Sequence, residues 1–217
     1  LSTFHDVLGS DPLRHAALTS VTVSGIATAI SLPLALGAAY SVVRLRARGR
    51  RLVYLFVLAA LLLPLVAVAG PLADQLIAFG TYDSRLALVP PALLITLPLS
   101  IWLCVSLFGT VSWSLHDAVR ADGATLWQQF RRLAVPALGP GVLPIALLVF
   151  FVGCQDFTLG AALSSGDPSR PLPATLLLAT SGSGAVGEPS ATVAAVGLLW
   201  LVLPFVLLLV APRKVSK

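Results

Sequence analysis

Residues 17–51 read ALTSVTVSGIATAISLPLALGAAYSVVRLRARGRR, an apolar run that ends abruptly in a basic cluster. The run from Ala17 to Val43 contains no charged residue, and it exceeds the roughly 20 apolar residues that a helix needs to cross a bilayer. Arginines placed directly after such a run hold the adjoining loop on the cytoplasmic side of the membrane. This stretch therefore predicts a transmembrane helix whose C-terminal end faces the cytoplasm.

The composition extends this interpretation to the whole chain of 217 residues. Apolar residues make up 57% of the sequence and charged residues 11%, and the mean hydropathy is +0.95. About a quarter of the residues of a soluble domain are charged, so a soluble enzyme and a disordered chain are both excluded. The apolar runs are long and do not alternate, which favours helices. The predicted fold class is an all-α, polytopic transmembrane helical bundle.

Five spans are predicted, at about residues 17–43, 52–69, 86–108, 140–163 and 191–210. The predicted transmembrane domain covers residues 17–210, between an extracytoplasmic lead-in (1–16) and a cytoplasmic tail (211–217). Within it, the spans are joined by the basic cluster at 44–51, a stretch ending at Arg85, a cytoplasmic segment (109–139) and a loop (164–190). Pro64, Gly70 and Pro71 are expected to break the second span. Because the chain starts at Leu1, we expect a sixth span upstream of it.

The distribution of basic residues orients the predicted spans. With the cluster at 44–51 in the cytoplasm, eleven of the 14 lysines and arginines lie in cytoplasmic segments and three lie on the opposite side. Such a bias is the usual mark of cytoplasmic loops in membrane proteins. The net charge of +5 is thereby explained without a nucleic-acid partner.

The cytoplasmic segment contains SLHDAVRADGATLWQQFRRLAVPALGPG, residues 114–141. Gly123 interrupts two short helix-compatible stretches, and glycine suits a sharp turn because it tolerates positive φ. After the turn, Leu126, Phe130 and Leu133 form an apolar stripe at helical spacing, with Trp127 beside it. Pro136 is expected to end this second helix. Such a helix can dock into a groove on another protein or rest on the bilayer surface, and the residues alone leave both alternatives open.

The same segment resembles the coupling loop of bacterial ABC-importer membrane subunits. That loop begins with Glu-Ala-Ala, has a glycine about six residues later and ends in Leu-Pro some twelve residues further on. The matching residues here are Asp117-Ala118-Val119, Asp122-Gly123-Ala124, Phe130, Leu133 to Pro136, and Pro140-Gly141. Asp117 stands where the family has glutamate, which keeps the charge on a shorter arm.

Two further stretches resemble the carbohydrate branch of that family, whose best-known member is the maltose permease. Gln155-Asp156-Phe157 stands where the branch has Asn-Glu-Phe, and residues 165–173 resemble the loop that follows. An ionised Asp156 within an apolar run costs about 2.5 to 3.5 kcal/mol, so it must face a cavity or a partner group. It is expected either to line the substrate pathway, together with Gln155, or to make a structural hydrogen bond.

The resemblance implies a transport subunit that couples to separate ATPases. Residues expected at the ATPase contact are Asp117, Ala118, Asp122, Gly123, Ala124, Trp127, Phe130 and Pro136. The implied partners are a second permease subunit in a heterodimer, two ATPase subunits, an extracytoplasmic substrate-binding protein and membrane lipid. The sequence has no G-x-x-x-x-G-K-[ST] nucleotide-binding pattern, so ATP and Mg²⁺ are expected on the partners, with no cofactor, metal or catalytic residue in this chain.

The expected location is the bacterial cytoplasmic membrane, and the expected cargo is a sugar or sugar derivative. The alternatives are a non-sugar solute in the same role (a polyol, glycerophosphodiester, thiamine or metal chelate) and, in a different class, a membrane scaffold or channel without an ATPase. Finding an ATPase in the solubilised complex separates the last alternative from the others.

Overall fold

The structure is a computed structural model that describes residues 11–44, 49–110, 123, 125–156, 158–165, 169–180 and 197. Within these residues all regular structure is helical. The elements are α2 (Asp11–Val43), α3 (Arg50–Leu62), α4 (Leu65–Ala78), the 3-10 turn η1 (Leu86–Leu88), α5 (Val89–Gly109), α7 (Leu126–Gln129), the π-helix η2 (Phe130–Ala134), α8 (Val135–Cys154), α9 (Thr158–Leu163) and α10 (Leu172–Thr180). The predicted all-α class is confirmed for this part of the chain.

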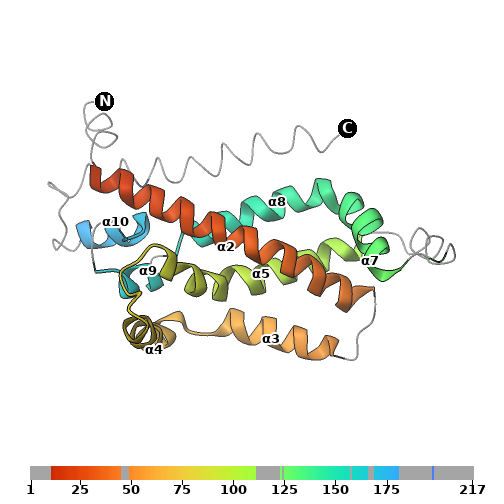
Figure 1. Cartoon of the computed structure of the whole chain (residues 1–217), viewed down its shortest axis with the longest axis horizontal. Helices are drawn as coiled ribbons and strands as arrows, with labels where there is room; N and C mark the ends of the chain where they lie inside the picture. Colours follow the sequence, from red (N-terminus) through yellow and green to blue (C-terminus); the bar gives the residue numbers. More distant parts are fainter. Residues whose placement is uncertain are drawn as a thin grey trace.

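Three long helices form the centre of the bundle. α2 packs along α5, and α8 packs against both, while α3 flanks α5 on the other side (Figure 1). Towards one end of the bundle the core is apolar and contains the buried side chains of Tyr40, Cys104, Phe108 and Leu138. At the other end α9 packs against α4, and α10 packs against α2 and α9.

A stripe of small polar residues on α2 is buried between the helices. Its members are Thr19, Ser20, Ser24, Thr28 and Ser31. Ser100 on α5 donates a hydrogen bond of 3.2 Å to Ser31 Oγ, and small side chains let helices approach closely where lipid supplies no hydrophobic drive. This stripe lies where α2 packs against its neighbours, which places α2 at the centre of the bundle.

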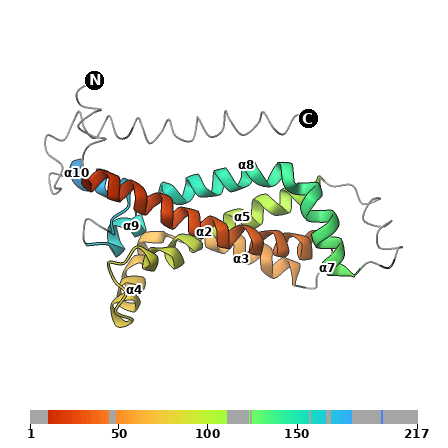
Figure 2. The ribbon, with the colours of Figure 1, turned by 45° about the horizontal axis from the view of Figure 1, so that its top comes forward.

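The second predicted span is sharply bent at its proline. α3 and α4 meet at an angle of 92°, and Pro64 lies directly before α4 in extended backbone, as its restricted conformation favours. Figure 2 shows α4 turning away from the direction of α3. The predicted break at Gly70 and Pro71 is wrong, because α4 continues through both to Ala78. The missing N–H of Pro71 removes one backbone hydrogen bond without ending the helix.

The fourth predicted span also differs from the structure. α8 begins at Val135, earlier than Pro140, and ends at Cys154 instead of continuing to Leu163. Gln155 and Asp156 separate it from the short helix α9. The long apolar run conceals this break because the break depends on a side-chain hydrogen bond, described below.

In the part of the chain that the structure describes, two helices are long and apolar enough to cross a membrane, α2 and the combined stretch Leu86–Gly109, and the bent α3–α4 pair adds a third if it counts as one span. α2 includes residues 11–16 of the predicted lead-in, which are therefore helical and not a loop. The predicted loop 164–190 contains α10. The fifth predicted span, 191–210, lies outside the described residues except for Gly197.

Candidate functional site

The second half of the predicted coupling loop begins with a defined turn and cap. Gly123 has a φ of 78°, so the positive backbone angle expected from the sequence is observed. Thr125 then starts α7 through a capping box, in which its Oγ1 accepts the Gln128 N–H at 3.3 Å and its own N–H donates to Gln128 Oε1 at 2.9 Å. These reciprocal bonds satisfy backbone donors at the helix start and fix where the helix begins.

The apolar residues of this segment divide into an exposed pair and an inward anchor. The side chains of Leu126 and Trp127 are 55% and 66% exposed. Phe130 turns inward, with its ring centroid 5.3 Å from that of Tyr40 on α2. The Tyr40 ring in turn lies 5.9 Å from Phe108 on α5. Phe130 therefore ties the segment to the core, and Trp127, whose centroid is 5.8 Å from Phe130, stands at the outer edge of the same aromatic group.

Pro136 does not end the helix, contrary to the sequence prediction. Residues 130–134 form a π-helix, in which the Val135 N–H bonds to the Phe130 carbonyl, and α8 continues directly from Val135 through Pro136. The wider turn of a π-helix changes the usual bonding pattern of the following residues, so the absent proline N–H is tolerated here. The segment from Leu126 to Cys154 is thus one uninterrupted helical run.

Both views place α7 at the end of the bundle where α2 ends and α3 begins (Figures 1 and 2). The arginines of the predicted cytoplasmic cluster adjoin the same helix ends, including Arg44, Arg50 and Arg51. Asp117, Ala118, Asp122 and Ala124 lie outside the described residues, so their role stays a prediction.

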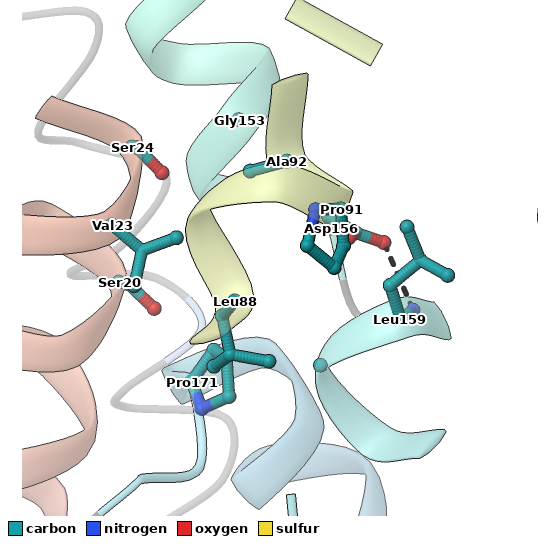
Figure 3. A pocket seen from close by; sticks show the side chains of 11 residues that line it. Ser20, Val23, Ser24, Leu88, Pro91, Ala92, Gly153, Asp156, Leu159 and Pro171 are labelled. Carbon is teal, nitrogen blue, oxygen red and sulfur yellow. Dashed lines mark hydrogen bonds between the residues drawn. The ribbon is translucent and has the colours of Figure 1, made fainter. Parts of the chain in front are cut away.

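The predicted polar position at Asp156 is a helix cap. Asp156 Oδ1 accepts the backbone N–H of Thr158 at 3.1 Å and that of Leu159 at 3.3 Å. These are two of the N–H groups that a new helix leaves without backbone partners. Figure 3 shows the carboxylate turned towards Leu159 at the start of α9. Gln155, beside it, is exposed.

Asp156 also borders a small cavity between α2, α5, α8 and α9. The cavity holds about 20 Å³, which is room for about one water molecule. Figure 3 shows Ser20 and Ser24 of α2 at one side of it and Pro171 below. The structure thus supports the hydrogen-bonding interpretation of Asp156 directly, and it also places the residue at a mostly apolar cavity whose polar lining residues are Ser20, Ser24 and Asp156 itself.

Sequence reasoning missed a clasp at the end of the bundle opposite α7. Asp83 accepts hydrogen bonds from Ser165 N–H at 3.0 Å, from Ser165 Oγ at 3.2 Å and from Ser169 Oγ. Arg170 Nη2 donates to the Ser165 carbonyl at 2.7 Å. Asp83 itself has a φ of 64°, which is uncommon for a residue other than glycine. Ser165, Ser169 and Arg170 lie in the stretch that resembles the carbohydrate branch, but nothing in the sequence pairs them with Asp83.

Comparison with known proteins identifies the family of this chain. Residues 31–214 match the family described as "Binding-protein-dependent transport system inner membrane component". The chain belongs to this family. It is accordingly an inner-membrane permease subunit of an ABC importer and not an enzyme, and ATP hydrolysis belongs to partner subunits.

Among curated relatives, the chain is 29% identical over 212 residues to the trehalose transport system permease protein SugB of Mycobacterium tuberculosis, covering 98% of this chain and 77% of that protein. It is 28% identical to the trehalose/maltose permease MalG of Thermococcus litoralis, covering 78% and 62%. It is 32% identical to the diacetylchitobiose permease NgcG of Streptomyces coelicolor, covering 68% and 49%. The chain therefore spans less than two thirds of the length of the last two relatives.

Solved structures agree on the fold. A bacterial ABC transporter that imports the acidic polysaccharide alginate matches with a TM-score of 0.77 at 17% identity, over 100% of this chain and 84% of that chain. The MetNI methionine transporter matches with a TM-score of 0.76 at 18% identity, over 95% and 97%. At these identities the likeness concerns the fold alone, which is that of an importer permease.

The capping role of Asp156 predicts a difference between two substitutions. Asp156→Ala removes the acceptor and is expected to cost about 0.5 to 2 kcal/mol of stability. Asp156→Asn keeps a side-chain oxygen, and asparagine caps helices about as well as aspartate, so its stability and transport should stay close to wild type. Melting temperature and uptake measured on the same purified complexes test this. Normal stability with lost uptake in Asp156→Asn would show instead that the charge itself serves the pathway.

Proposed function

We propose that this permease forms half of the translocation pathway for a sugar or sugar derivative and docks onto an ATPase through residues 109–139. Three observations support the cargo class: relatives named for trehalose, for trehalose and maltose, and for diacetylchitobiose. The alternative within the same role is a non-sugar solute such as a polyol, a glycerophosphodiester, thiamine or a metal chelate.

One observation carries the coupling role. The exposed pair Leu126 and Trp127 sits one turn before Phe130, whose ring packs against Tyr40 in the core. A helix that only rests on lipid does not need such a core contact. A helix that transmits movement of an ATPase needs an exposed surface to bind the ATPase and a firm contact with the bundle that it moves. Large aromatic side chains are also the usual anchors of protein interfaces.

The following helix, α8, connects this segment to the other end of the bundle. α8 runs without interruption from this segment to Cys154, and the break at Asp156 and the small cavity come directly after it. A displacement of Trp127 is therefore transmitted along one helical run to Asp156, the polar residue that follows α8 at the other end of the bundle. We infer that movement of this helix opens and closes the pathway bordered by Gln155 and Asp156.

The complete complex that we propose contains a second permease subunit, two ATPase subunits and an extracytoplasmic binding protein. The proposed topology has five spans in this chain, with a sixth upstream and the coupling loop in the cytoplasm. Asp117, Ala118, Asp122, Gly123, Ala124 and Pro136 complete the proposed ATPase contact alongside Trp127 and Phe130. A further related structure is the bacterial alginate transporter in complex with an alginate pentasaccharide-bound periplasmic protein, which supports the last of these partners.

Trp127→Ala tests the docking surface. The exposed ring makes few contacts within the chain, so we expect normal insertion and stability but at least tenfold weaker retention of the ATPase, since interface hot spots contribute about 2 kcal/mol or more. The measurement is ATPase occupancy of the affinity-purified complex. Phe130→Ala should differ, because removing the ring that contacts Tyr40 also lowers the melting temperature of the subunit.

Trp102→Ala is the matched control, because Trp102 on α5 has a similar exposed fraction of 58% but lies within a span. It should leave ATPase occupancy unchanged. Full occupancy in Trp127→Ala would instead assign the segment to the bilayer surface. The cargo is identified separately by screening sugars and the alternative solutes against the partner binding protein, and binding of the alternatives alone would overturn the sugar assignment.

A further inference from the structure

An apolar groove runs between α3 and α5 on the side of the bundle away from α2. Its volume is about 300 Å³. Val57 and Ile101 form its floor, each 7% exposed, while Tyr54, Leu58 and Trp102 form walls that are 50% to 58% exposed. The groove therefore has a packed base and exposed walls that belong to α3 and α5, two helices that lie side by side (Figure 1).

The lining of the groove does not favour a polar ligand. Ser106 Oγ already donates a hydrogen bond to the Trp102 carbonyl at 3.2 Å. The other lining side chains are aliphatic or aromatic. Tyr54 and Trp102 offer one hydroxyl and one indole N–H, too few to replace the hydration that a sugar or another polar solute would lose in this groove, whereas a hydrocarbon chain needs no such partners.

One end of the groove is basic. Arg50 and Arg51 begin α3, and residues three and four apart on a helix share a face, so the face that carries Tyr54 continues back to these two arginines. Both arginines are exposed. Within the described part of the chain, neither forms an ion pair.

We propose that this groove binds an anionic phospholipid of the cytoplasmic leaflet, with one acyl chain between α3 and α5 and the phosphate at Arg50 and Arg51. Basic sites between membrane helices at the cytoplasmic side are suited to anionic headgroups. Tyr54, one turn further along α3, is an amphipathic residue of the kind found at the headgroup level. The orientation rests on the topology proposed above, but the lipid site does not depend on the cargo or on ATPase docking.

The test uses the complete purified complex, delipidated and then titrated with phosphatidylglycerol or phosphatidylcholine while native mass spectrometry counts bound lipids. Wild type should bind phosphatidylglycerol more tightly. Each basic residue contributes about 1 kcal/mol at the surface, or about fivefold in affinity, so Arg50→Gln/Arg51→Gln should lose roughly 25-fold for phosphatidylglycerol. The loss for phosphatidylcholine should be much smaller, because its choline offsets the charge of its phosphate. Arg50→Lys/Arg51→Lys keeps the charge and should keep most of the preference.

A second variant tests the acyl chain separately from the charge. Val105→Trp fills the groove and should reduce the binding of both lipids while leaving Arg50 and Arg51 in place. Equal affinity of wild type for the two lipids would overturn the proposal. So would unchanged lipid binding in Val105→Trp, or cross-linking of a Tyr54→Cys variant to a second permease subunit, because the groove would then be covered by protein.

Discussion

A Gly153→Val substitution is expected to destabilise the permease by about 1 to 3 kcal/mol, the usual cost of overpacking a well-packed interior. Gly153 lies near the end of α8 and faces Ser24 of α2 and Thr96 of α5. A Cβ atom at this position would lie 3.2 Å from Ser24 Oγ and 3.3 Å from Thr96 Cγ2. Valine adds two further carbons beyond that atom, so the three central helices must move apart. The measurement is the melting temperature of the purified complex.

Gly139→Val provides the matched control on the same helix. No atom of the described part of the chain lies within 4 Å of a Cβ built at Gly139, and valine is a somewhat better helix former than glycine. This variant should therefore match or slightly exceed the wild-type stability. Equal melting temperatures for the two variants would contradict the close approach at Gly153.

The features that the sequence predicts well are those set by local composition. The spans of α2 and α5 are identified by uncharged runs long enough to cross a bilayer as a helix. Burying charge in lipid is costly whatever the fold, so such runs mark spans. Pro64 marks a bend for a similarly local reason, since proline restricts the residue before it and cannot donate a backbone hydrogen bond. The turn at Gly123 is predicted for a local reason too, because glycine tolerates the positive φ that is observed there.

The features that the sequence predicts poorly depend on neighbours or on relaxed helix geometry. Pro136 lies within a continuous helix because the preceding turn is a π-helix, and nothing in FRRLA (residues 130–134) indicates that wider turn. The break after Cys154 depends on the hydrogen bonds of Asp156 to Thr158 and Leu159. α10 lies in a stretch whose glycine, serine and proline content suggests a loop, and its start is stabilised by a bond of 2.9 Å from the Leu172 N–H to Ser20 Oγ on α2.

At the candidate site, too, local features are predicted from the sequence and features that depend on distant residues are not. The apolar stripe of Leu126, Phe130 and Leu133 draws attention to Phe130 and to Trp127 beside it, but periodicity alone cannot tell that Trp127 is exposed and that Phe130 packs on Tyr40. That difference follows from the position of α2, which is remote in sequence. The clasp at Asp83 escapes sequence reasoning entirely, because it joins two loops through side-chain bonds to Ser165 and Ser169.

The turn at Gly123 supplies the prediction with the largest effect on transport. Its φ of 78° lies in the left-handed region, where a β-branched residue is strained by about 1 to 3 kcal/mol. No atom of the described part of the chain lies within 4 Å of an added Cβ, so the strain concerns the backbone and not crowding. In Gly123→Val the turn should abandon this geometry, which shifts the direction in which α7 presents Trp127. We expect an inserted, folded subunit whose ATPase activity no longer drives uptake.

Comparison with Gly123→Asn distinguishes backbone strain from every other effect of a side chain at this position. Asparagine adds a side chain of about the size of valine's, yet it tolerates positive φ far better. Uptake into vesicles should therefore be lost in Gly123→Val and largely retained in Gly123→Asn, with equal amounts of both subunits in the membrane. ATP hydrolysis measured beside uptake gives the number of ATP molecules used per solute, which should rise sharply only for valine. Equal loss of uptake in both variants would mean that no side chain is tolerated at position 123, whatever its backbone preference. The left-handed turn would then not explain why this position needs glycine.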